Sequence, residues 1–184
     1  MTKSKHYRMI KKGIKQMKIV INSCYGGFSL SPKGEQRYLE LKGLQSYFYK
    51  QTKYNYADNT LEFARVDNID DVPDLFFYCT TYDQGKTISD YPKDVFHCRN
   101  LERSDPILIQ VVEELGAESF GKCARLEIID IEKGRWFKID EYDGLEDVQY
   151  RDIDDEWILS EWKETNYGIY YGRIWTVYGW KEIR

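Results

Sequence analysis

The feature that most constrains the fold is a succession of strand, glycine-containing loop and helix that begins at Met17. Residues 17–21 are mostly apolar and β-branched, which favours a buried strand. Gly26-Gly27 let the backbone turn where side chains would clash. Ser31-Pro32 predicts the start of a helix, because serine caps helices and proline suits the first helical position, and Gly43 predicts its end.

The remaining apolar patterns predict a second helix and several short strands. Asp105 can cap a helix whose first residue is Pro106, and apolar residues recur on one face until Gly116 ends the run. The polar segment 82–101 is predicted to be a long loop. The predicted strands form a hairpin from 44–49 and 61–66, a buried strand over 75–80, a second hairpin from 124–128 and 135–139, and a closing hairpin within 157–180.

These elements predict an α+β fold with a mixed or mainly antiparallel sheet. The two principal helices, near 31–42 and 105–115, are expected to pack on one face of it. A chain of 184 residues is long enough for one sizeable core, so we expect a single domain over residues 17–184. Residues 1–16 are basic and polar with little periodicity, and we expect them to be a mobile leader.

Charge is distributed unevenly along the chain. The first 34 residues contain eight bases and no acid, which leaves 19 bases against 31 acids in the rest, a balance of −12. A basic arm can bind nucleic acid, although a solvated tail explains the same composition. The leader residues that could contact nucleic acid are Lys5, Arg8, Lys11, Lys12 and Lys15.

The acidic body is most concentrated between Asp140 and Glu164. Eleven acids stand there against two bases, Arg151 and Lys163, with Tyr and Trp residues interleaved. Carboxylates spaced among aromatic rings can imitate the phosphates and bases of nucleic acid and so occupy a basic groove, although a charge run is also typical of a solvated surface. The candidate partner-binding residues are Asp152, Asp154, Asp155, Glu156, Trp157 and Trp162.

Cys24 is the candidate nucleophile, because it lies in the glycine loop ahead of a helix whose N-terminal dipole could lower a thiol pKa. Its base would have to be His97, since the other histidine lies in the basic leader. The alternative is a small buried cysteine that packs the loop. The four cysteines are widely spaced without a C-x-x-C pair, which favours reduced thiols, and no metal site or cofactor is predicted.

Two blocks of the sequence resemble a group of small proteins encoded by bacterial viruses and prophages. The first is Asn22-Ser-Cys-Tyr-Gly-Gly-Phe-Ser-Leu-Ser31, and the second is Arg103-Ser-Asp-Pro-Ile-Leu-Ile-Gln-Val-Val-Glu-Glu-Leu-Gly116. Residues 124–131 and 141–144 are similar as well, so that the resemblance rests on 36 of the 184 residues. It implies a viral origin and a shared scaffold, and it attaches no reaction to either.

Together these observations predict a phage-encoded accessory protein rather than an enzyme. It would bind and inhibit a host nucleic-acid-handling defence protein in the host cytoplasm, for example as an anti-CRISPR inhibitor of a Cas nuclease, without a membrane anchor. One alternative is a small cytosolic cysteine-dependent hydrolase or transferase built around Cys24, and another is a nucleic-acid-binding protein that acts through the leader. The identity of the target, the oligomeric state and the strand order stay open at this point.

Overall fold

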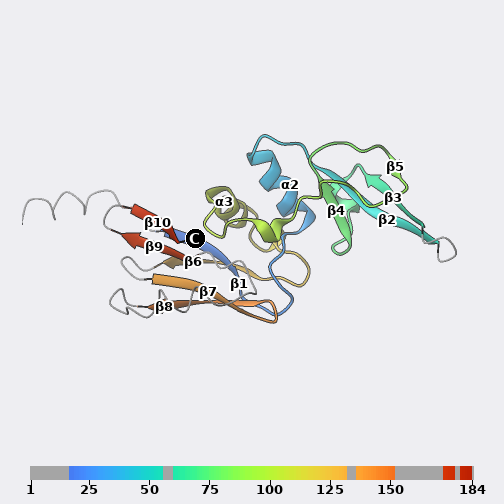
Figure 1. Cartoon of the computed structure of the whole chain (residues 1–184). Coiled ribbons are helices and arrows are strands. Elements are labelled where there is room, and N and C mark those ends of the chain that lie inside the picture. Colours follow the sequence, from blue (N-terminus) through green and yellow to red (C-terminus); the bar gives the residue numbers. More distant parts are fainter. Residues whose placement is uncertain (1–16, 56–59, 132–135, 152–171, 177–178, 184) are drawn as a thin grey trace, which may run out of the picture.

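The computed structural model describes residues 17–55, 60–131, 136–151, 172–176 and 179–183. Its helices lie between two groups of strands (Figure 1). The longer elements are β1 (Met17–Asn22), α2 (Pro32–Leu41), β2 (Tyr47–Asn55), β3 (Thr60–Val66), β4 (Phe77–Thr80), β5 (Thr87–Ile88), α3 (Pro106–Leu115), β6 (Leu126–Ile131), β7 (Trp136–Tyr142), β8 (Leu145–Arg151), β9 (Gly172–Thr176) and β10 (Gly179–Ile183). Three short 3₁₀ helices in the described ranges are η1 (Ile69–Asp71), η2 (Cys98–Asn100) and η3 (Gly116–Ser119).

Every strand pairing in the described residues is antiparallel, which confirms the α+β class and the mainly antiparallel architecture. The strands form three sheets in these residues, ordered β1-β6, β10-β9-β7-β8 and β4-β2-β3-β5. Packing of both helices on one face is not confirmed, because α3 contacts β1 and β6 whereas α2 contacts β4. In Figure 1 the two helices accordingly lie between the sheets.

Strand β1 is buried on both faces, as its apolar sequence predicts. Val20 belongs to the main core, which also contains side chains of α2, α3, β2 and β4. Ile19 and Ile21 point the other way, into a smaller core with Ile131 and Phe137. Because successive side chains of a strand alternate between faces, a strand with two buried faces must be apolar at nearly every position.

Both helices begin where their capping residues predict. Ser31 Oγ accepts a hydrogen bond from the backbone N–H of Gly34 at 3.0 Å, and Asp105 Oδ1 accepts one from Ile107 at 2.8 Å. The hydroxyl of Tyr38 on α2 donates to the other carboxylate oxygen of Asp105 at 2.7 Å. The caps therefore also join the two helices.

The first predicted hairpin is confirmed by the β2–β3 pairing, although residues 56–59 between the two strands lie outside the described residues. The second predicted hairpin is wrong. Strand β6 pairs with β1, and β7 pairs with β8 across Asp143-Gly144, where both residues have positive φ. Alternation of apolar residues identifies a strand and its inward face, but it does not identify the strand's partner.

Two further predictions need a change of boundary. The buried strand predicted over 75–80 begins only at Phe77, because Leu75 and Phe76 are exposed. The segment 82–101, predicted to be a loop, contains β5 and η2. The closing hairpin is β9–β10, while residues 157–171 lie outside the described part of the chain.

Candidate functional site

The glycine loop after β1 is held in place by the buried side chain of Asn22. Its amide nitrogen donates to the carbonyl oxygens of Cys24 and Gly144, both at 2.6 Å. Its amide oxygen accepts from the backbone N–H of Arg125 at 2.8 Å. The polar atoms of the Asn22 side chain thus all have hydrogen-bond partners, and these partners lie in three segments far apart in the sequence. The role of Asn22 is therefore structural.

The loop's glycines are required by close backbone contacts. A Cβ atom on Gly26 would lie 2.5 Å from the carbonyl oxygen of Cys123. A Cβ atom on Gly144, in the β7–β8 turn, would lie 2.2 Å from the backbone nitrogen of Gly27. Gly26 and Gly144 also have positive φ, which side chains disfavour. The glycine pattern is therefore explained by packing of the loop against Cys123 and against the β7–β8 turn.

A buried ion pair stabilises the region around the glycine loop. Glu146 on β8 accepts from the backbone N–H of Asn22 at 2.8 Å and pairs with Arg103 at 2.7 Å. The guanidinium carbon of Arg103 lies 3.5 Å from the centroid of the Phe28 ring, a cation–π contact. Glu146 belongs to the acidic run predicted to form a surface, but here it is buried and has a structural partner.

Cys24 is half-buried, and two hydrogen-bond acceptors lie within reach of its thiol. The acceptors are Asn22 Oδ1 at 3.5 Å and the carbonyl oxygen of Cys123 at 3.3 Å. A thiol carries one proton, so it donates to one of these two acceptors at a time. His97 is exposed at the start of η2, and no hydrogen bond joins it to Cys24 in the described residues.

Sequence reasoning missed a buried carboxyl group on α2. Glu35 is 5% exposed, and its Oε2 atom has no hydrogen-bond partner in the described residues. Burial raises its pKa to about 8, and the thiols of Cys79 and Cys98 beside it oppose that rise. The burial of Cys98 raises its pKa to about 12, so this thiol stays protonated near neutral pH. Helical spacing carried the signal, because Glu35 lies one turn before the buried Leu39.

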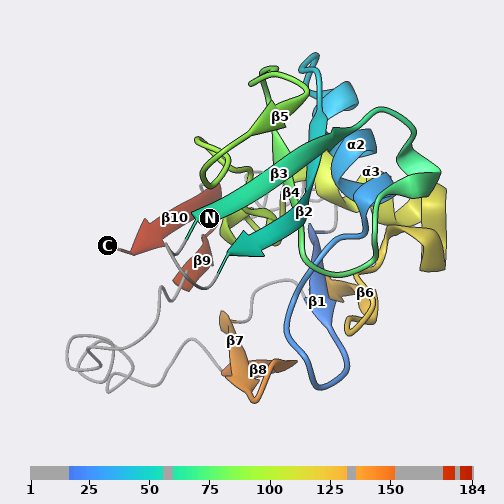
Figure 2. The same cartoon turned by 90° about the vertical axis from the view of Figure 1, so that its right-hand side faces the viewer.

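The largest acidic feature of the described residues runs from 67 to 94. It contains seven aspartates and two lysines, a balance of −5. Three of its aromatic side chains are exposed, namely Phe76 at 85%, Tyr91 at 53% and Tyr82 at 41%. The segment comprises the β3–β4 connection, β4, the β4–β5 connection, β5 and the six residues after it, along the sheet that β2 and β3 dominate in Figure 2. We call its exposed side chains the acidic aromatic surface.

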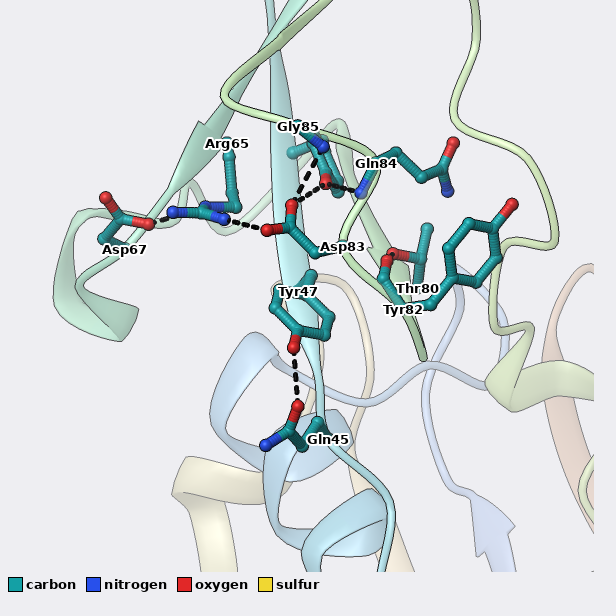
Figure 3. A network of polar contacts seen from close by, with 10 residues as sticks. Gln45, Tyr47, Arg65, Asp67, Thr80, Tyr82, Asp83, Gln84 and Gly85 are labelled. Carbon is teal, nitrogen blue, oxygen red and sulfur yellow. Dashed lines mark hydrogen bonds and ion pairs between the residues drawn. The ribbon is translucent and has the colours of Figure 1, made fainter.

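A polar network holds the second half of this surface (Figure 3). Arg65 on β3 pairs with Asp67 at 2.7 Å and with Asp83, and so links the segments before and after β4. The backbone N–H of Gly85 donates to Asp83 at 2.9 Å, and this bond together with Arg65 holds the pKa of Asp83 below its usual range. The Tyr49 hydroxyl accepts from the backbone of Gln84 at 2.8 Å.

The network also includes the residues just after β5. The Gln84 side chain donates to the carbonyl oxygen of Lys93 at 2.8 Å and accepts from its N–H at 2.9 Å. Tyr91 packs on Phe63 and Tyr78, with ring centroids 5.3 and 6.0 Å apart. A loop that reads as polar and featureless in sequence is thus fixed to β2 and β3, and it presents its acids in a set geometry.

The candidate partner-binding residues from the sequence, Asp152, Asp154, Asp155, Glu156, Trp157 and Trp162, lie outside the described residues. The leader residues Lys5, Arg8, Lys11, Lys12 and Lys15 do as well. Across the described ranges, His, Cys, Asp and Glu side chains nowhere form a group of three that could hold a metal ion. None of the helices in the described part of the chain is long and apolar enough to cross a membrane.

Comparisons with protein-family models, with curated proteins and with solved structures found no match to this chain. The resemblance to phage and prophage proteins therefore stays a prediction from the sequence.

Proposed function

We propose that the protein is a phage-encoded accessory protein that binds a host nucleic-acid-handling defence protein and inhibits it, as an anti-CRISPR inhibitor of a Cas nuclease would. The acidic aromatic surface is the observation that carries this proposal. It supplies negative charge and flat apolar rings together, which are the two properties that a nucleic-acid groove selects. The host cytoplasm is where such a partner would be met.

The rigidity of this surface supports the proposal. Arg65, Tyr49 and Gln84 hold the acidic loop on the sheet, so little conformational entropy is lost when a partner binds. The charge of the surface matches that of the partner, because grooves that hold nucleic acid are lined by Lys and Arg. Negative charge would also repel free nucleic acid, which disfavours direct binding of DNA by this face.

The contacts of Cys24 do not favour an enzymatic function. Its thiol has two acceptors within reach, and in the described residues no hydrogen bond joins it to His97. The buried thiol of Cys98 has a raised pKa, so it is no better as a nucleophile. A binding function would use the acidic aromatic surface, and neither cysteine belongs to that surface.

The proposal is tested by direct binding to purified Cas9–guide RNA and Cas12–guide RNA complexes. We expect the full-length protein to bind at least one of them, with an association rate that falls as salt rises. Target DNA bound beforehand should block the protein, since both occupy the same basic groove. Cleavage of a labelled target should be inhibited in proportion to occupancy.

Charge reversal at Asp71 and Asp74, which are exposed, should slow association with the complex. The matched control reverses two exposed acids on β6, Glu127 and Asp130, and changes net charge equally. A second variant converts Asp152, Asp154, Asp155 and Glu156 to lysine and asks whether that run contributes as well. Absence of binding to every complex, or binding that target DNA does not block, would contradict the proposed function.

A further inference from the structure

Phe76 is presented to solvent in an unfavourable backbone conformation. It is 85% exposed and has a φ of +60°. For a bulky side chain this region of backbone space is disfavoured, and such strain persists only where the surrounding structure imposes it. Its ring makes no aromatic contact among the described residues, and Leu75 beside it is 40% exposed. Nothing inside the described fold therefore uses this ring.

The chain on either side of Phe76 is firmly held. Before it, Asn68 caps η1 by accepting from the N–H of Asp70 at 3.2 Å, and Val72 is buried in the main core. After it, Phe77 packs on Phe48 with ring centroids 5.9 Å apart. Leu75 and Phe76 therefore lie at a fixed, exposed position of the β3–β4 connection, because the residues before and after them are packed in the core.

The same connection carries acids that the described residues do not neutralise. Asp67 and Asp70 are paired, with Arg65 and with Lys33. Asp71 and Asp74 are exposed and form no ion pair with the described residues. Two unpaired carboxylates therefore stand within five residues of an exposed aromatic ring, with no basic residue between 67 and 76. This combination is complementary to an apolar pocket with a basic rim, and water solvates such a ring poorly.

We infer that Phe76 is the apolar anchor of the interface, inserting into an apolar pocket on a basic, nucleic-acid-binding partner while Asp71 and Asp74 meet lysines or arginines at its rim. The inference rests on the proposed function and specifies which part of the acidic aromatic surface makes the central contact. Central aromatic anchors carry a disproportionate share of binding energy, whereas rim charges act mainly on the association rate. The two kinds of residue are therefore separable by kinetics.

The test measures association and dissociation rates of full-length variants on the Cas–guide RNA complex that the unmodified protein binds. Phe76→Ala should weaken binding at least about tenfold, mainly through faster dissociation, and Phe76→Leu should retain most of the affinity. Tyr142→Ala is the matched control, since Tyr142 is 78% exposed at the end of β7 and also lies beside acids in the sequence. It should change affinity by less than about twofold.

The outcomes separate the two proposals. If the unmodified protein binds none of the complexes, the proposed function fails and the anchor fails with it. If it binds but Phe76→Ala binds equally well, or Tyr142→Ala weakens binding more, only the anchor is overturned. Circular dichroism and the thermal midpoint of each variant verify folding, because truncation of an exposed side chain should leave both nearly unchanged.

Discussion

The glycine loop after β1 and the β3–β4 connection differ in how their unusual backbone is used. In the glycine loop, positive φ falls on Gly26 and Gly27, and Gly144 packs its backbone directly against Gly27. In the β3–β4 connection positive φ falls on Phe76, whose ring points into solvent. The loop's irregular backbone is explained by contacts inside the protein, whereas that of the connection is not.

This difference shows where a binding function is to be sought. The sequence singles out the glycine loop as a candidate site, through Cys24, and does not single out the β3–β4 connection. In the structure, the polar groups of Asn22 and Glu146 beside the loop are satisfied internally. The connection instead has two exposed carboxylates and an exposed aromatic ring without an ion pair or ring contact among the described residues. The following changes test this contrast, with the two large effects first and the small one last.

Gly144→Ala should destabilise the protein by about 4 kcal/mol, because the new Cβ would overlap the Gly27 backbone and the residue keeps a positive φ. Gly43→Ala is the control. Gly43 also has positive φ, but nothing lies within 4 Å of its Cβ position, so only the conformational penalty of about 1 kcal/mol applies. Urea denaturation measures both. Equal losses would show that the loop and the β7–β8 turn are not closely packed.

Unlike Asn22 and Glu146, Glu35 has a buried oxygen without a hydrogen-bond partner in the described residues. This group should make the stability of the protein depend on pH. Its folded-state pKa of about 8 lies above the ordinary glutamate pKa of 4.5, so the folded state favours the protonated acid. Stability should be greatest below pH 4.5 with respect to this group. It should fall as pH rises to about 8, by at most about 4 to 5 kcal/mol.

Glu35→Gln imitates the neutral acid and should remove this dependence, so that the variant is more stable than the unmodified protein at pH 8. Denaturation curves at pH 5 and pH 8 give the comparison. Glu40→Gln, on the exposed side of the same helix, is the control and should leave the pH profile unchanged. A profile that is identical in Glu35→Gln and the unmodified protein would mean that water or a rearrangement satisfies the Glu35 carboxylate.

Phe76→Asn should stabilise the free protein slightly, by about 0.5 to 1 kcal/mol, because asparagine tolerates positive φ better than phenylalanine. Tyr142→Asn should show no such gain, since Tyr142 is not among the residues with positive φ in the described chain. Thermal denaturation detects the difference. A loss of stability in Phe76→Asn would mean that the ring has an internal role, which would remove the contrast between the two regions.

Local patterns predicted the elements well where backbone and capping chemistry are decisive. The β1 strand, the caps Ser31 and Asp105, and the helices that follow these caps lie where the sequence placed them. These features depend on interactions within a few residues, so a single segment contains the information. The acidic run was also visible, but composition alone did not reveal that Glu146 within it is buried.

Tertiary structure decided which strands pair and which individual side chains are buried or exposed. Strand β6 could have paired with its neighbour β7, but its apolar faces are buried when it pairs with β1 between the two cores. The exposure of Phe76 and the burial of Glu35 run against their residue types, because each depends on what the rest of the chain places beside it. The sequence by itself determined the local elements and the negative charge of the body. The tertiary structure alone decided which acids and rings face outward, since burial arises from contacts between segments that are distant in the chain.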